Sequence, residues 1–125
     1  MILIPRITEV NQANHISNLA IMAWFENARA DISQLLDNDP NGKEFISVIA
    51  RIDCQFKSEV FYGSEVEIKT IVAAVGNSSI TINQKAFQKG VLAAESTTII
   101  VHFNSNEKCA TSIPDTLRKL LLSYA

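Results

Sequence analysis

The chain has 125 residues, 47% of them hydrophobic, and a formal net charge of −2, which suits a single domain with a real core and leaves no room for a second. Charges of both signs are interspersed, so no basic stripe indicates a nucleic-acid-binding protein. The apolar run before Pro5 is too short for a signal-peptide core or a membrane span. We therefore expect one domain, residues 1–125, in the cytoplasm, which binds neither nucleic acid nor membranes.

The two cysteines, Cys54 and Cys109, lie far apart and lack the spacing of a CxxC motif or of a Cys/His metal site. We expect both thiols to be reduced, with Cys54 as a small core residue. No set of His, Cys and carboxylate residues has metal-ligand spacing, and no glycine-rich phosphate loop is present. The sequence therefore predicts no metal and no cofactor.

The first predicted elements are a short strand at residues 2–8, which Pro5 places at an edge or an end of the sheet, and one long helix from Leu19 to Leu36. The helix is predicted from apolar residues that recur at spacings of four and three, namely Ile21, Phe25, Ala28, Ile32 and Leu35. Further apolar residues widen this stripe, so the helix should be mostly enclosed. Ser17 or Asn18 can cap its start.

Four predicted strands follow a dense group of turn formers at residues 37–42. From Phe45 to Phe56 the apolar residues alternate, which predicts one half-buried face that includes Ile46, Val48, Ile52 and Cys54. A second strand begins at Val66, with a bulge or burial of both faces near residues 71–72. Turns at 76–78 and 89–90 join it to strands at 80–86 and 91–103, which together predict a meander. Residues 112–121 should form a last helix with Pro114 in its first turn.

This order of elements predicts an α+β domain in which a curved antiparallel sheet wraps a central helix. Such a sheet also has open edges and a second face. The apolar content of residues 91–103 on both faces suggests that both are covered, which favours association of subunits. We therefore expect a homodimer or a dimer of dimers.

Polar side chains gather just before the helix, where Asn11, Asn14 and His15 precede its first turn. Free backbone N–H groups and the positive end of the helix dipole can hold an oxyanion at such a place. The ordinary interpretation is that these residues only cap the helix and shape a turn. In the same way, Trp24 and Phe25 can be core residues rather than substrate contacts.

The run NQANHISNLAIMAWFENAR, residues 11–29, resembles the signature D-x-x-G-H-V-N-N-x-x-Y-x-x-W-F-E-x-A-R of hotdog-fold acyl-CoA thioesterases of the 4-hydroxybenzoyl-CoA thioesterase type. Residues 56–66, FKSEVFYGSEV, resemble the strand–turn–strand of that family, which ends in Tyr-Gly-Asp. The resemblance implies the hotdog fold and hydrolysis of an acyl-CoA or acyl-carrier-protein thioester. Two departures from the signature matter for the chemistry, since Asn11 replaces an aspartate and Asn14 replaces a glycine.

The resemblance, together with the needs of the reaction, assigns roles to eight residues. Thioester hydrolysis requires a polarised carbonyl, an oriented water and a group that takes its proton. Asn18 and the backbone amides of the helix start are assigned to polarise the carbonyl, and Asn11 is assigned to orient the water. His15 or, as the second choice, Glu26 is assigned to take the proton of the water. The expected substrate contacts are Asn14, Trp24, Phe25 and Tyr62.

The departure at Asn11 keeps other functions open, because an amide is neither a base nor a nucleophile at neutral pH. One alternative is a hotdog-fold protein that binds acyl thioesters but has lost the catalytic carboxylate. Another is a purely structural homo-oligomer.

Overall fold

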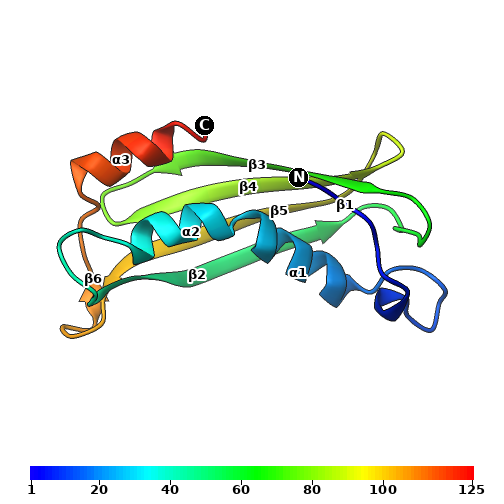
Figure 1. Cartoon of the computed structure of the whole chain (residues 1–125), viewed down its shortest axis with the longest axis horizontal. Helices are drawn as coiled ribbons and strands as arrows, with labels where there is room; N and C mark the ends of the chain where they lie inside the picture. The colour runs from blue at the N-terminus through cyan, green and yellow to red at the C-terminus, as the bar shows by residue number, and fades with distance from the viewer.

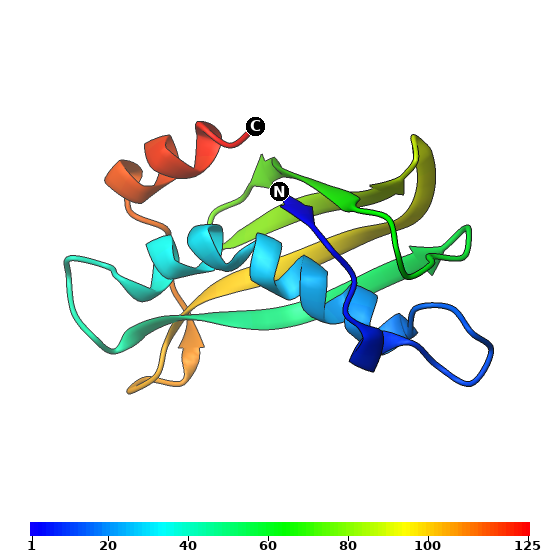
Figure 2. The same ribbon diagram turned by 45° about the vertical axis from the view of Figure 1, so that its right-hand side comes forward.

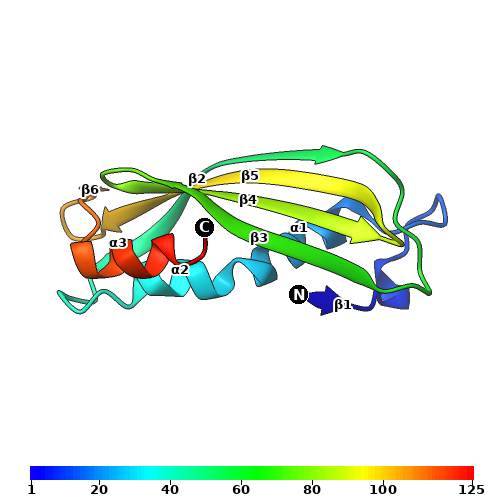
Figure 3. The same ribbon diagram turned by 90° about the horizontal axis from the view of Figure 1, so that it is seen from above.

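The computed structural model describes residues 1–125 and consists of one antiparallel sheet with the helices on one of its faces (Figures 1 and 3). The strands are β1 (Ile2–Leu3), β2 (Phe45–Phe56), β3 (Val66–Val75), β4 (Ser79–Gln88), β5 (Val91–Asn104) and β6 (Cys109–Ala110). The helices are α1 (Asn18–Ala28), α2 (Ala30–Asp37) and α3 (Asp115–Leu122), with a short 3-10 turn, η1, at Ile7–Glu9. A curved sheet against a central helix is the hotdog fold, as the sequence predicted.

The order of strands across the sheet is β1-β3-β4-β5-β2, with β6 beside β5. The meander predicted for β3, β4 and β5 is confirmed, and Lys89 and Gly90 turn the chain between the last two with positive φ angles of 51° and 75°. The position of β2 differs from the simple meander, because β2 pairs with β5 and not with β3. The chain therefore crosses the end of the sheet between Phe56 and Val66 and leaves one side of β2 unpaired.

Strand β2 contains a bulge that the sequence pattern did not reveal. Ile49 lies opposite Ile100 and Arg51 lies opposite Ile99, so Ala50 is the extra residue. Because a bulge reverses the alternation of side chains, Val48 does not share a face with Ile52 and Cys54. The prediction of one continuous apolar face along β2 is therefore wrong, and most of this edge strand is exposed.

The predicted single helix is interrupted at Arg29, whose φ of −98° and ψ of 2° separate α1 from α2. No glycine or proline lies nearby. Instead, the side chain of Gln84 on β4 donates a 2.8 Å hydrogen bond to the carbonyl of Phe25, which also accepts from the N–H of Arg29. A side chain that binds a helical carbonyl is a known cause of a helix kink.

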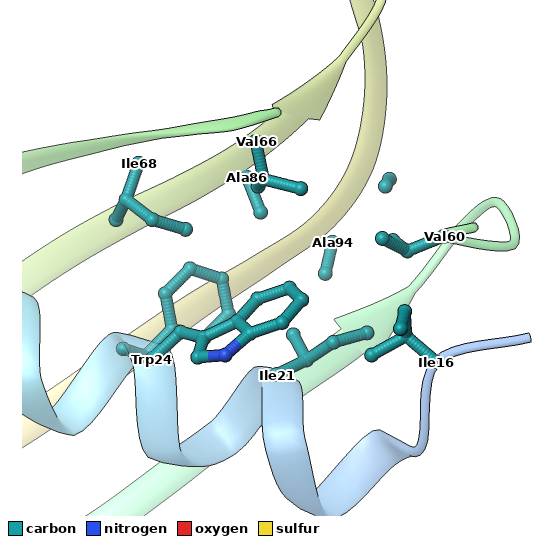
Figure 4. Close-up of a cluster of buried hydrophobic side chains, with 10 residues drawn as sticks. Ile16, Ile21, Trp24, Val60, Val66, Ile68, Ala86 and Ala94 are labelled. Atoms are coloured by element: carbon teal, nitrogen blue, oxygen red, sulfur yellow. The ribbon is translucent and has the colours of Figure 1, made fainter. Parts of the chain in front are cut away.

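The core consists of two separate apolar clusters. The first packs α1 on one half of the sheet, and Figure 4 shows Ile21 and Trp24 directed toward strand residues such as Val66 and Ile68. The second lies under α2 and α3 and comprises Ile32, Leu36, Val72, Ile80, Ile82, Ile100, Ile113, Leu117 and Leu121.

Between the clusters, a row of neighbouring residues crosses the helix-facing side of the sheet, one from each of four strands. The register places Thr70 beside Gln84, Gln84 beside Ser96, and Ser96 beside Cys54. Paired residues of an antiparallel sheet point to the same face, so this row lies directly under the helix break. Arg29 bonds Gln84 there, and the core is thus divided by polar groups.

Candidate functional site at the start of α1

The loop before α1 is held closed by Asn11. Its Oδ1 accepts the backbone N–H groups of Ala13 at 3.0 Å and of His15 at 3.4 Å, while its own N–H donates to the carbonyl of His15 at 2.8 Å. Asn14 adopts a φ of 66°, in the left-handed region that glycine enters freely and asparagine enters more readily than most residues. Asparagine at this position therefore allows the same tight turn that the glycine of the resembling signature would form.

The start of α1 leaves one backbone donor available. Ser17 is the N-cap, and its hydroxyl accepts the N–H of Leu19 at 3.2 Å. The amides of Ala20 and Ile21 both donate to the carbonyl of Ser17. The N–H of Asn18 bonds no other protein atom, and Asn18 is exposed. This amide, at the positive end of the helix dipole, can donate to a ligand oxygen.

The loop that contains His15 lies beside a second loop, between β2 and β3, at the same end of the molecule (Figure 2). A 2.7 Å hydrogen bond from the N–H of Ile16 to the carbonyl of Val60 joins the two loops. The Nε2 of His15 is 3.9 Å from the Oε1 of Glu59, so the carboxylate can stabilise a positive imidazolium. Sequence reasoning missed Glu59, although it lies within the 56–66 stretch that resembles the family.

The second loop is fixed by a buried side chain. Gln88 on β4 accepts the N–H of Phe61 at 3.0 Å and donates to the carbonyls of Phe61 and Ser64 at 2.8 and 3.0 Å. This arrangement presents Tyr62 at the surface, where 55% of it is exposed. Tyr62 is exposed at the end of the sheet where His15 lies, and its role as a substrate contact stays a prediction.

Three other predicted residues lie away from the helix start. Trp24 and Phe25 are buried in the first apolar cluster, and Trp24 Nε1 donates to Glu9 Oε2 at 2.9 Å. Glu26 is exposed. It lies two turns beyond Asn18, because the eight-residue separation of the two positions spans roughly 12 Å of helix. Within one chain, the structure brings together Asn11, Asn14, His15 and Asn18 but does not bring Glu26 to them.

Two side chains have shifted pKa values, and both lie near the polar row of the core. Burial lowers the pKa of the Arg29 guanidinium, an effect that the negative charge of Glu26 partly opposes. Burial, together with the nearby charge of Asp53, raises the pKa of the Cys54 thiol. Both cysteines are free, and no group of three or more His, Cys, Asp and Glu residues could hold a metal ion. None of the helices is both long and apolar enough to span a membrane.

The fold is that of the hotdog thioesterases. Residues 5–121 match the family model of the thioesterase-like superfamily, and the chain therefore belongs to that superfamily. The resemblance stated from the sequence is thus confirmed. An uncharacterized protein of Bacillus subtilis (strain 168), YsmA, is 27% identical over 78 residues, or 62% of this chain. The match covers 53% of YsmA, so the chain spans about half the length of this curated relative.

Solved structures agree with this assignment. A predicted thioesterase from Bacillus stearothermophilus is 30% identical, with a TM-score of 0.91 over 100% of this chain and 94% of that one. A thioesterase from Thermus thermophilus, solved in complex with coenzyme A and Zn, has a TM-score of 0.83 at 19% identity, over 99% of this chain and 92% of that one. At that identity the second likeness supports the fold alone.

Proposed function

We propose that this protein hydrolyses a thioester of coenzyme A or of an acyl carrier protein at the start of α1. The observation that carries the proposal is the free N–H of Asn18, which follows the loop that holds His15. The imidazole of His15 in turn faces Glu59 on the loop between β2 and β3. A relative of the same fold binds coenzyme A, as its name states, which supports this class of ligand. Residues 1–125 act as a single hotdog domain in this proposal.

In the proposed reaction, the thioester carbonyl accepts a hydrogen bond from the Asn18 amide, which stabilises the oxyanion that develops when water attacks. Loss of one such donor typically lowers the rate about 10²–10³-fold. His15 takes the proton of the water, and Glu59 stabilises the imidazolium that results. Because Asn11 Oδ1 is occupied by two backbone amides, its side-chain NH2, which bonds no protein atom, is the group left to orient the water.

A hydrolysis screen over acyl-CoA thioesters of varied chain length and aromatic character tests the proposal. Release of free thiol should be measurable for at least one substrate and should fall when His15 is replaced. Trp24, Phe25 and Tyr62 remain proposed acyl contacts, and among them only Tyr62 is exposed in the single chain. Absence of turnover with every thioester, including acyl-carrier-protein substrates, would contradict the enzymatic proposal.

The second candidate function is binding of acyl thioesters without turnover, favoured by the amide at Asn11. The variant Asn11→Asp separates the two, because a carboxylate oxygen can accept the same two backbone amides and preserve the loop. A gain in hydrolysis would indicate a binding protein derived from an enzyme. A similar or lower rate, combined with a damaging His15→Ala, would indicate that His15 is already the base. A retained acyl ligand, detected by mass spectrometry of the purified protein, would exclude a purely structural role.

The proposal also includes a homodimer or a dimer of dimers in the cytoplasm. Strand β2 has an unpaired side and carries exposed Val48, Ile49, Ile52 and Phe56, which suit pairing with a second copy. The helix start is open in the single chain, since Leu19 is 80% exposed beside Asn18. A second subunit would enclose the acyl group more fully.

A further inference from the structure

A groove runs between the helices and the edge strand β2, on the helix-facing side of the sheet. Glu26, Arg29 and Ser33 line it from the helices, and Ser47 and Ile49 line it from β2. Its volume is about 380 Å³. The groove begins where α1 ends, so it lies away from the helix start and is not part of the site described above.

The innermost charged group of this groove is Arg29, which is only 5% exposed. A guanidinium has five N–H donors. The structure pairs only one of its nitrogens, Nη1, at 3.4 Å from Gln84 Oε1, and no carboxylate lies within ion-pairing distance. The other guanidinium nitrogens have no protein partner and are not fully buried, so a ligand in the groove can reach them. Arg29 therefore has no ion-pair partner within the single chain.

Two further buried donors lie in the same part of the core. The hydroxyls of Ser96 and Thr98 are buried without any hydrogen-bond partner. Ser96 is the register neighbour of Gln84, the residue that Arg29 contacts, and Thr98 follows on the same face of β5. We call Arg29, Ser96 and Thr98 the donor patch: Arg29 lines the groove, and the two hydroxyls lie deeper in the core without lining it.

We propose that this donor patch binds an oxygen acceptor, most favourably a carboxylate, at the far end of the acyl chain of the thioester. The inference rests on the proposed thioesterase function and names its substrate class: acyl groups with a polar terminus. A carboxylate is favoured over a hydroxyl because it neutralises Arg29 and accepts from several donors at once. Glu26 and Asp37 also line the groove, but both are exposed, so solvent screens their repulsion.

The length of the acyl chain follows from the length of α1. Its 11 residues span roughly 16 Å at about 1.5 Å per residue. A thioester held at Asn18 can therefore reach Arg29 only through a medium or long chain. Short acyl groups would leave the donor patch empty and should show no preference for a polar terminus.

The test compares dodecanoyl-CoA with its ω-hydroxy and ω-carboxy counterparts. For the wild type, kcat/KM should be highest for the ω-carboxy substrate, about tenfold or more above dodecanoyl-CoA, as one charge-assisted hydrogen bond would give. Arg29→Gln should remove this preference while dodecanoyl-CoA is still hydrolysed. Arg51→Gln, which removes an exposed arginine of β2, is the control and should retain the preference. Equal rates for the three substrates with the wild type would overturn the inference and leave the proposed function intact.

A second variant covers the case in which Arg29→Gln does not fold. Ser96→Ala removes a hydroxyl that bonds nothing, so the melting temperature should stay unchanged or rise. Its preference for the ω-carboxy substrate should nevertheless decrease, which a merely structural serine would not cause. An unchanged preference in Ser96→Ala would exclude this residue from the patch and overturn the inference as stated.

Binding of free acids tests the inference when no thioester is hydrolysed. Calorimetry should detect tighter binding of dodecanedioic acid than of dodecanoic acid, and Ser96→Ala should reduce this difference. That result would support the donor patch even if the thioesterase proposal failed. Equal or absent binding of the two acids, together with no turnover, would overturn both.

Discussion

His15 is the side chain on which the proposed chemistry depends most. Its only charged neighbour is Glu59 at 3.9 Å, so removal of the imidazole breaks no strong interaction of the folded chain. We expect His15→Ala to lower kcat about 10²–10⁴-fold with little change in stability, as loss of a general base does. Steady-state kinetics and thermal melting measure the two effects.

The matched variant for His15 is Glu59→Gln, which keeps the size of the side chain and removes its charge. It should lower kcat less than His15→Ala does, because the imidazole remains. If a folded His15→Ala retained full turnover, the proton would have to pass to another group.

The two cysteines should differ in reactivity. The raised pKa of the Cys54 thiol keeps it protonated at neutral pH, and only the thiolate reacts with alkylating reagents. Cys109 is exposed, so iodoacetamide should modify Cys109 first and Cys54 only as the pH increases. Mass spectrometry of tryptic peptides over a pH series measures this order. Faster modification of Cys54 at neutral pH would contradict the assigned burial.

At the scale of elements, the loop after α2 is tied to the sheet by a fully buried pair. Asp39 Oδ2 lies 2.8 Å from His102 Nε2, with side-chain exposures of 1% and 0%, and the ring of Phe45 stacks on the imidazole. Asp39→Ala would leave His102 buried without its hydrogen-bond partner and should lower the free energy of unfolding by about 1–3 kcal/mol.

Urea denaturation measures this loss, and Asp53→Ala, at an exposed position, is the control expected to change little. Hydrolysis per folded molecule should be unaffected, because the pair lies at the opposite end of the α1–α2 segment from His15. A cost below about 1 kcal/mol would mean that the loop is held by other contacts.

The elements that sequence reasoning predicted are those fixed by local signals. Ser17 caps α1 because its hydroxyl accepts the N–H of Leu19. The turn at residues 89–90 follows from local backbone preferences. The break at Arg29 depends on Gln84, 55 residues later in the chain, and no local pattern predicts it. The same holds for Glu59, whose position beside His15 results from the crossing between β2 and β3. In the site, the loop residues were predictable and their long-range partners were not.

At the scale of the whole molecule, we expect association through β2. A long edge strand with exposed apolar side chains is an unfavourable surface for a monomer. Light scattering at micromolar concentration should therefore show no monomer. Ile52→Lys places a charge on the exposed strand and should shift the protein toward the monomer, whereas Arg51→Lys should not. A monomer peak for the wild type would contradict both the association and the enclosure of the acyl group by a second subunit.

The polar row between the two apolar clusters also bears on how this chain can change during evolution. Side chains in different clusters share few contacts, and the effects of mutations at such separated sites are usually additive. Substitutions under α2 and α3 can therefore accumulate while Ile16, Ile21 and Val60 continue to hold the helix start in place. A divided core of this kind allows one half of the fold to diverge while the other half is kept.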